Sequence, residues 1–290
     1  MSETGKTVLV SGAGRGLGKA LALEFLSKGW RVAATDISEP EFDDPAAGSL
    51  FESHPQTRKN LLLLKMDVTS DESVADVYRF LADQKITLNL IINNAGIDRY
   101  LLLSAAPVKE FRQIFEVNVF GAYRVNQVFI PLLKRPGGRI IHIGSESLNL
   151  CMPFMAYPLS KKLLEGYAKG LRHELKFYGI AVVVIRPGAI DTELLKTVSS
   201  LARSVGKEEP GDPLQQAFAN FAQQAEKEIG KVISPAAAAS FIYRVACIPR
   251  PRAVYRINNM LQLRIAALLP FGLIEKIVHK RLSKKLHDNE

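Results

Sequence analysis

Short aliphatic runs recur along the chain, and stretches with apolar residues at helical spacing lie between them. The runs are rich in valine, isoleucine and leucine, which is typical of buried strands. Residues 17–28 have the spacing of a helix, and Gly29 follows as a stop signal. In the first third of the chain, the predicted strands are Thr7–Ser11, Arg31–Thr35, Leu61–Met66 and Leu88–Ile92.

The same alternation continues in the second half of the chain. A long helix over residues 108–133 precedes a strand at Arg139–Gly144, and another helix begins near Tyr157 before a strand at Ala181–Ile185. A less regular region follows from about residue 192 to 232. Strands alternating with helices require crossover connections, so the fold class is α/β, a Rossmann-type doubly wound parallel sheet in a single domain.

Composition sets the limits of the domain organisation. A chain of 290 residues with 47% hydrophobic content favours one large domain over two small ones. We expect a catalytic domain over residues 1–256, including a substrate loop at 190–232, and a basic amphipathic C-terminal extension at 257–290. The N-terminus lacks the pattern of a secretory signal, which favours a cytoplasmic protein. The two cysteines and five scattered histidines show no metal-ligand spacing, so no metal is expected.

A glycine-rich turn, SGAGRGLG, connects the first predicted strand to the first predicted helix. Glycines at such a place let the backbone approach a pyrophosphate, which binds the free N–H groups of the helix N-terminus. The turn therefore predicts a dinucleotide site. Its glycines are Gly12, Gly14, Gly16 and Gly18.

Acidic residues end the next two strands. Asp36 lies 18 residues beyond Gly18, where a carboxylate can accept hydrogen bonds from both adenosine ribose hydroxyls and would repel a 2′-phosphate. This favours NAD, while Arg15 in the turn leaves NADP open. Asp67 ends the third strand and could hold the adenine amino group. Because an anionic cofactor suits a mildly basic enzyme, the net charge of +9 requires no nucleic-acid partner.

Tyr157 and Lys161 form a YxxxK pair, whose spacing places both side chains on one face of a helix. An ammonium group beside the phenol would lower the pKa of Tyr157 and make it a proton donor and acceptor near neutral pH. Ser145 ends a strand 12 residues earlier and could donate to a carbonyl oxygen. The three residues together predict interconversion of an alcohol and a ketone or aldehyde.

These motifs resemble the classical short-chain dehydrogenase/reductase family over residues 5–250. The resemblance rests on Gly12, Gly16 and Gly18, on NNAG at Asn93–Gly96, on the tetrad Asn118, Ser145, Tyr157 and Lys161, and on Pro187–Gly188. It implies that Lys161 binds the nicotinamide ribose, that Asn118 positions a water and that Thr192 contacts the carboxamide. The cofactor-binding residues then comprise Ser11, Gly12, Gly14, Arg15, Gly16, Leu17, Gly18, Asp36, Ile37, Asp67, Val68, Asn94, Ala95, Gly96, Asn118, Tyr157, Lys161, Pro187, Gly188, Ile190 and Thr192.

The chain departs from the family pattern around the catalytic strand. Ser11 replaces the usual threonine but keeps a hydroxyl, and His142 and Gly144 alter the surroundings of the serine. Ser147 is close enough to be a rival for Ser145. We prefer Ser145, because it directly ends the strand and matches the family's position.

The loops beyond the strand ends, at 97–104, 146–156 and 189–232, are rich in apolar residues and suggest a hydrophobic alcohol or ketone. The alternative is that these residues pack the loops onto the core. Within the family, MPFMAYPLSK and the basic tail resemble the steroid and retinol dehydrogenase branch. The predicted substrate-binding residues are Ser145, Leu150, Met152, Phe154, Tyr157, Leu194 and Leu195.

The C-terminal extension mixes leucine and isoleucine with basic residues. It could contact a membrane surface, pack on its own domain or meet a partner subunit, although Pro270 and Gly272 interrupt a long helix. The resemblance implies a homodimer or homotetramer formed through the helices at 108–133 and 157–178. Two other functions stay open, a cofactor-binding regulatory protein and a reductase of small polar carbonyl compounds.

Overall fold

The computed structural model of the chain describes residues 5–149, 153–195, 212–227, 231–266 and 268–283. Seven strands form one sheet in the order β3-β2-β1-β4-β5-β6-β7, and every neighbouring pair is parallel. The strands are β1 (Thr7–Ser11), β2 (Arg31–Asp36), β3 (Leu61–Lys65), β4 (Leu90–Asn93), β5 (Arg139–Ile143), β6 (Ala181–Pro187) and β7 (Val254–Ile257).

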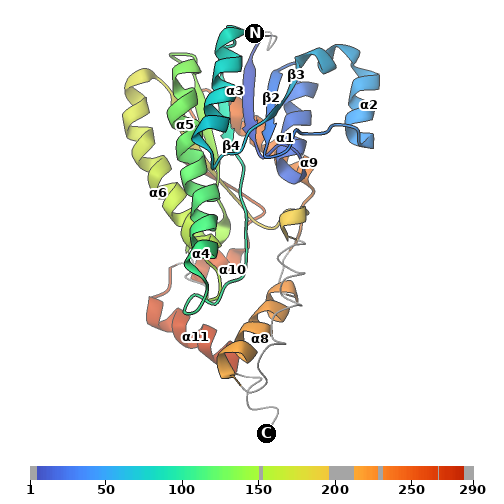
Figure 1. Cartoon of the computed structure of the whole chain (residues 1–290). Coiled ribbons are helices and arrows are strands. Elements are labelled where there is room, and N and C mark those ends of the chain that lie inside the picture. The colour runs from blue at the N-terminus through green and yellow to red at the C-terminus, as the bar shows by residue number, and fades with distance from the viewer. Residues whose placement is uncertain (1–4, 150–152, 196–211, 228–230, 267, 284–290) are drawn as a thin grey trace.

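Helices cover both faces of the sheet and one end of it (Figure 1). The α-helices are α1 (Gly16–Ser27), α2 (Pro45–Ser53), α3 (Asp71–Asp83), α4 (Val108–Phe115), α5 (Ala122–Phe129), α6 (Tyr157–Leu175), α8 (Pro213–Lys227), α9 (Pro235–Cys247), α10 (Leu261–Ala266) and α11 (Phe271–Ser283). Shorter helical turns are η1 (Pro55–Asn60), η2 (Glu116–Gly121), η3 (Ile130–Leu132), η4 (Glu146–Asn149) and η5 (Lys176–Tyr178). The doubly wound parallel sheet predicted from the sequence is confirmed.

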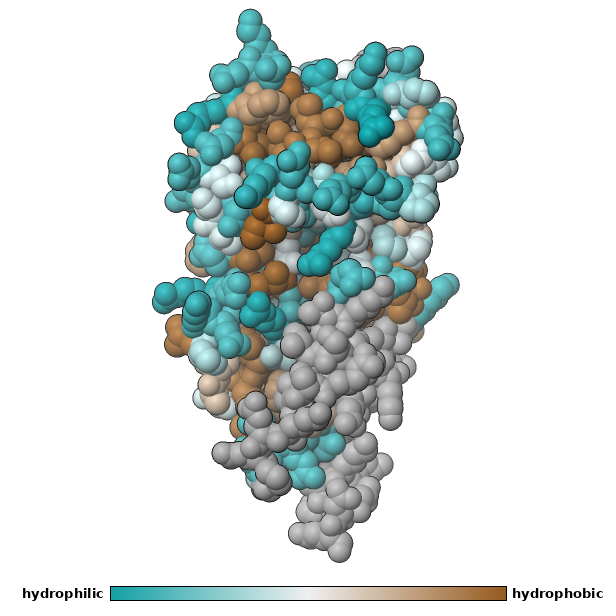
Figure 2. Space-filling model, turned by 45° about the vertical axis from the view of Figure 1, so that its right-hand side comes forward, coloured by the Kyte–Doolittle hydropathy of each residue, from teal (hydrophilic) through white to brown (hydrophobic). Residues whose placement is uncertain are grey.

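Two hydrophobic cores follow from the alternation of side chains along the strands. Val8 and Val10 point toward α1 and α9, whereas Leu9 between them points toward α3, α5 and α6. Because helices cover both faces, the central strands β1 and β4 are buried at every position. Polar residues dominate the outer surface, with apolar patches between them (Figure 2).

From β1 the chain adds β2 and β3 on one side of the sheet and then β4 to β7 on the other side. β1 and β4 lie side by side where this order of addition reverses. In open parallel sheets, ligands bind beyond the carboxyl ends of the strands at such a switch point. The glycine turn after β1 and the NNAG turn after β4 both lie there. In Figure 1, α8, α10 and α11 lie beyond the same end of the sheet.

Two local features differ from the sequence prediction. The helix predicted over 108–133 is divided into α4, the π-helical turn η2, α5 and the 3₁₀ turn η3. The strand β7 was not predicted, and the expected domain boundary after residue 256 falls inside it. This strand is short, contains Arg256 and has no fully buried residue, so its hydrophobic signal is weak.

Candidate active site

Left-handed backbone shapes the glycine turn between β1 and α1. Gly12 has φ of +67° and Gly16 has φ of +54°, a region that side chains disfavour. A Cβ atom on Gly18 would lie 1.9 Å from the carbonyl oxygen of Gly12, so only glycine lets this turn close. The turn therefore brings backbone N–H groups at the start of α1 against the cavity wall.

Hydrogen bonds join the glycine turn to the NNAG turn. The Ser11 hydroxyl oxygen accepts from the backbone N–H groups of Asn94 and Ala95 at 3.1 and 3.2 Å. The Asn94 side-chain amide donates to the carbonyl oxygens of Ser11 and Gly12 at 3.0 and 2.9 Å. Ser11, predicted as a cofactor residue, is buried behind the turn and fixes its shape.

Asp36 ends β2 beside the glycine turn. Its Oδ2 atom accepts from the backbone N–H of Gly14 at 2.7 Å, and its Oδ1 atom accepts from Ile37 at 2.8 Å. Each carboxylate oxygen can accept more than one hydrogen bond, so both keep capacity for ribose hydroxyls. A Cβ atom on Gly14 would lie 2.9 Å from Oδ2, and glycine therefore allows this close approach.

One cavity of about 2120 Å³ runs from the glycine turn past Tyr157 to the C-terminal helices. Its volume exceeds that of a typical single-ligand pocket, about 300–1,000 Å³, and is large enough for a dinucleotide together with a substrate. Ser11, Gly14 and Asn118 support its wall from behind. The other predicted cofactor residues line it, namely Gly12, Arg15, Gly16, Leu17, Gly18, Asp36, Ile37, Asp67, Val68, Asn94, Ala95, Gly96, Tyr157, Lys161, Pro187, Gly188, Ile190 and Thr192.

Tyr157 is the first residue of α6, and Pro158 follows it in the first helical turn, where proline is well tolerated. The Ser160 hydroxyl donates to the Tyr157 carbonyl at 2.7 Å. Farther along α6, Glu165 pairs with Arg186 of β6 through two hydrogen bonds, one of them 2.7 Å from Nε to Oε2. This buried pair fixes the helix that carries Tyr157 and Lys161 against the sheet.

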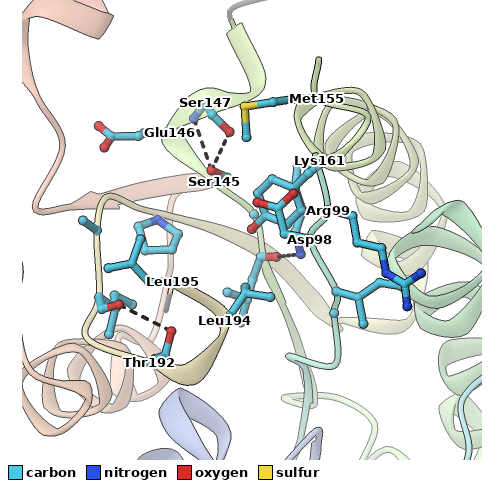
Figure 3. A pocket seen from close by; sticks show the side chains of 18 of the residues that line it. Asp98, Arg99, Ser145, Glu146, Ser147, Met155, Lys161, Thr192, Leu194 and Leu195 are labelled. Carbon is cyan, nitrogen blue, oxygen red and sulfur yellow. Dashed lines mark hydrogen bonds between the residues drawn. The ribbon is translucent and has the colours of Figure 1, made fainter. Parts of the chain in front are cut away.

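Three of the predicted catalytic residues, Ser145, Tyr157 and Lys161, line the cavity, and Figure 3 shows Ser145 and Lys161 on its wall. The Ser145 hydroxyl interacts with the Tyr157 side chain and lowers the pKa of its phenol. The Lys161 ammonium lies 5.4 Å from the centre of the Tyr157 ring and donates to the Ile143 carbonyl at 2.9 Å. The Ser147 hydroxyl is 2.8 Å from that of Ser145. Ser147 is therefore placed to orient Ser145, which itself contacts the tyrosine.

Burial dominates the ionisation of this site. Desolvation raises the pKa of Tyr157 above its ordinary value, the charge of Asp98 raises it further, and the hydrogen bond from Ser145 lowers it only in part. Burial also lowers the pKa of Lys161 to about 8. The pKa of Tyr157 is therefore raised, whereas the sequence predicts a lowered value, because loss of solvent outweighs the effect of Ser145.

Asn118 lies in the π-helical turn η2 and is 1% exposed. Its Oδ1 atom accepts from the Ile97 backbone N–H at 2.8 Å, and its Nδ2 atom donates to the Ile97 carbonyl at 2.9 Å and to Ser160 at 3.0 Å. Asn118 therefore joins the loop after β4 to α6. π-Helical turns of this kind occur often at functional sites.

The substrate end of the cavity differs in part from the prediction. Leu194 and Leu195 line it, and Leu150 and Met152 lie outside the described residues. Phe154 is buried and packs its ring against Phe218 and Phe221, of which Phe221 reaches the cavity. Phe154, predicted to bind substrate, therefore supports the cavity wall from behind and does not line the cavity in this structure.

The C-terminal helices complete the wall. The Glu146 Oε2 atom, beside the catalytic serine, accepts from the backbone N–H of Met260 at 2.8 Å and from Asn259 at 3.1 Å. These bonds hold the start of α10 over the site. Apolar residues of α10, α11 and the turn between them line the cavity, among them Leu263, Ala266, Leu269, Ile274, Val278 and Leu282.

Sequence reasoning missed two parts of the site. Asp98 directly follows the NNAGI segment, in a loop that the sequence predicts to contact the substrate. That prediction concerns only the apolar residues of the loop and does not include Asp98. For the C-terminal helices the sequence allows contact with a membrane, with the rest of the domain or with a partner subunit. Their hydrophobic periodicity does not distinguish these three surfaces. His142, singled out beside the serine, is buried with Asn126 and Tyr167, and burial lowers its pKa to about 3.

Among the residues that the structure describes, no cluster of histidine, cysteine or carboxylate side chains could hold a metal ion. Within the same part of the chain, no helix is both long and apolar enough to cross a bilayer.

Comparison with known proteins places these features in one family. Residues 6–202 match the family model described as short chain dehydrogenase. The chain is 28% identical to an NADPH-dependent 3-dehydrocapnine reductase of Ornithobacterium rhinotracheale, covering 95% of this chain and 97% of that protein. It is 28% identical to estradiol 17-beta-dehydrogenase 2 of Rattus norvegicus, over 97% and 76% of the two chains.

A solved structure shows the same fold. A short-chain dehydrogenase/reductase from Burkholderia phymatum, in complex with NAD, superposes with a TM-score of 0.72 at 20% identity, over 95% of this chain and 96% of that one. The matched segment includes the glycine turn, the NNAG turn, Ser145 and the YxxxK pair. The chain therefore belongs to the short-chain dehydrogenase/reductase family of NAD(P)-dependent oxidoreductases.

Proposed function

We propose that the protein interconverts a hydrophobic secondary or primary alcohol and its ketone or aldehyde, with Tyr157 as acid and base. The observation that carries this proposal is the placement of Tyr157. Its side chain lies with those of Ser145 and Lys161 on the wall of a cavity that joins the dinucleotide site to an apolar chamber. The reacting carbon of a substrate would lie where these two parts of the cavity meet.

Each catalytic side chain has a distinct task in this proposal. A bound nicotinamide supplies or accepts the hydride. Ser145 donates to the carbonyl oxygen, Tyr157 gives it a proton in reduction and removes one in oxidation, and Lys161 holds positive charge beside the phenol. Because burial raises the pKa of Tyr157, the phenol stays protonated at neutral pH and is ready to donate.

Asp36 supports a preference for NAD. Its carboxylate is fixed at the end of β2 by the N–H groups of Gly14 and Ile37, beside the start of α1. A 2′-phosphate at this place would meet a negative charge, whereas ribose hydroxyls would donate to it. Arg15 also lines the cavity and could pair with a phosphate, so we propose NAD as preferred and NADP as the weaker cofactor.

A chain-length series tests the proposed hydrophobic substrate. In the reduction of ketones from butan-2-one to dodecan-3-one, we expect kcat/KM to rise by up to about fourfold per methylene, since burying a CH₂ group contributes about 0.8 kcal/mol. Val278→Asp should lower kcat/KM for dodecan-3-one about tenfold or more, because a carboxylate would then face the hydrocarbon. Oxidation of the reduced cofactor is the measurement.

Leu273→Asp is the matched control for this series. Leu273 lies on the same helix, is 46% exposed and is absent from the cavity wall. The control should leave the chain-length dependence intact. A flat series, with small polar aldehydes reduced best, would instead favour the reductase of small polar carbonyl compounds.

The outer surface of α10 and α11 supports peripheral membrane contact. Leu268 and Phe271 are 85% and 63% exposed at the turn between the two helices, and apolar patches mark the lower part of the face in Figure 2. Leu261, Ile265 and Ile277 are exposed as well and also line the cavity, so they form the rim of its mouth. Such a mouth could receive substrate from a lipid surface.

Vesicle flotation tests this contact. The protein should float with anionic phosphatidylserine vesicles, and the double variant Leu268→Asp with Phe271→Asp should lose about tenfold or more of that binding, because charges at the interface disfavour insertion. Phe177→Asp is the control, since Phe177 is 91% exposed on η5. Equal flotation of all three proteins would contradict membrane contact through this surface.

The homodimer or homotetramer implied by the family stays a prediction.

A further inference from the structure

Asp98 lies on the cavity wall directly after the NNAG turn. Both backbone groups of its neighbour Ile97 are hydrogen-bonded to the Asn118 side chain, at 2.8 and 2.9 Å. The backbone that carries Asp98 is therefore fixed in place. In Figure 3, the Asp98 side chain lies beside Lys161 at the centre of the site.

The Asp98 carboxyl group is incompletely bonded. Part of the residue is exposed to the cavity, but its Oδ1 atom is buried and has no hydrogen-bond partner. The backbone N–H of Arg99 bonds to the carboxyl group. Buried polar atoms in proteins nearly always have a partner, and an unpartnered acceptor that faces a ligand cavity indicates a donor supplied by the ligand.

The surroundings of this carboxyl group favour a cationic donor. Burial raises its pKa to about 7, and the Lys161 ammonium only partly offsets this effect. Lys161 directs a proton to the Ile143 carbonyl and serves the catalytic tyrosine. A second cation at Oδ1 would compensate the buried charge and supply the missing hydrogen bond, whereas an anionic substituent would be repelled.

The remaining wall defines the rest of the ligand. Beyond Tyr157, the cavity is lined by Met155, Leu194 and Leu195 and by apolar residues of the C-terminal helices. Figure 3 shows Asp98 beside Lys161, whose ammonium lies 5.4 Å from the centre of the Tyr157 ring, so the carboxyl group lies near the position of the reacting carbon. A substrate that uses both features has a polar end at the reacting carbon and a long hydrocarbon chain.

We propose that Asp98 is a specificity-determining residue, which binds a protonated amine on the carbon next to the reacting carbonyl while the hydrocarbon chain of the substrate fills the apolar chamber. This inference rests on the proposed function. It narrows the substrate class to long-chain amino ketones and the corresponding amino alcohols. The amine donates to Oδ1, and the hydride and proton are transferred at the neighbouring carbon.

Three probes that differ only at the amine test the proposal. These are 2-aminododecan-3-one, its N-acetyl derivative and dodecan-3-one, each reduced at neutral pH with excess reduced cofactor. Since a hydrogen bond to a charged group changes binding by about 10- to 100-fold, the wild-type protein should prefer the free amine to both other probes by that factor. The N-acetyl probe removes the charge but enlarges the amine side, whereas dodecan-3-one removes the charge without adding bulk, so a preference for the free amine over both probes isolates the effect of the charge.

The variant Asp98→Asn separates specificity from catalysis. It should lower kcat/KM for 2-aminododecan-3-one by about 10- to 100-fold more than kcat/KM for dodecan-3-one, so that the preference disappears. Equal changes for both ketones would overturn the proposal and make Asp98 a residue that tunes Tyr157 or Lys161. A wild-type protein that reduces dodecan-3-one as well as the amine also overturns it, while the proposed function stands.

Failure of the proposed function looks different. If the wild-type protein reduces neither long-chain ketone, the hydrophobic substrate fails and the role of Asp98 falls with it. Should Asp98→Asn not fold, the comparison of free and acetylated amine on the wild-type protein alone still decides. Loss of the preference on acetylation supports the proposal, and equal rates refute it.

Discussion

Replacing Tyr157 by phenylalanine is expected to lower kcat by about 10²- to 10⁴-fold, the range found for loss of a general acid. The phenol lies beside Ser145 and Lys161 on the cavity wall, where the two parts of the cavity meet. Phenylalanine keeps the ring and its contact with Lys161 but has no transferable proton. Affinity for the reduced cofactor, measured by its fluorescence, should change little, because Asp36 and the glycine turn are untouched.

Tyr167→Phe on the same helix is the matched control. Tyr167 lies nearly three turns farther along α6, where its hydroxyl accepts from Asn126 at 3.2 Å, away from the cavity wall. This variant should keep turnover close to that of the wild-type protein. If Tyr157→Phe retained comparable turnover, Tyr157 could not be the acid, and Ser145 or a water would have to supply the proton.

Asp36 controls the choice of cofactor in this account. Asp36→Ala should lower kcat/KM for NADH by about 10- to 100-fold, the value of hydrogen bonds to a charged group, while kcat/KM for NADPH changes much less or rises. The carboxylate accepts hydrogen bonds from the ribose hydroxyls of NADH, whereas it repels the 2′-phosphate of NADPH. Steady-state rates with both cofactors and one ketone measure the ratio.

Glu39→Ala serves as the control for Asp36. Glu39 is an exposed carboxylate three residues farther along the chain and is not part of the cavity wall. Its removal should leave the ratio of kcat/KM for NADH to kcat/KM for NADPH unchanged. Equal losses for NADH and NADPH in Asp36→Ala would mean that the side chain only shapes the glycine turn through its hydrogen bond to Gly14.

The sheet and the cofactor side of the site are predictable from the sequence because their signals are local. The first strand, Thr7–Ser11, is observed with the bounds that its aliphatic run predicts. Gly12 and Gly16 do have the left-handed backbone that only glycine adopts easily. YxxxK gains its meaning from Ser145, and both are brought together by the register of β5 and the start of α6.

The substrate side depends on tertiary contacts that no local pattern encodes. The bond from Met260 to Glu146 joins segments more than a hundred residues apart, so the place of α10 over the site cannot be read from its amphipathic spacing. Asp98 illustrates the same limit. In the sequence it is one acidic loop residue, and its buried, unpartnered oxygen becomes visible only when η2 and α6 pack against that loop.

The most direct test of the central claim is the loss of nicotinamide absorbance when the purified wild-type protein is given NADH and dodecan-3-one. We predict steady oxidation of NADH that depends on the ketone and is abolished in Tyr157→Phe. Tight binding of NADH without turnover of any ketone, aldehyde or alcohol would contradict this account and favour a cofactor-binding regulatory protein.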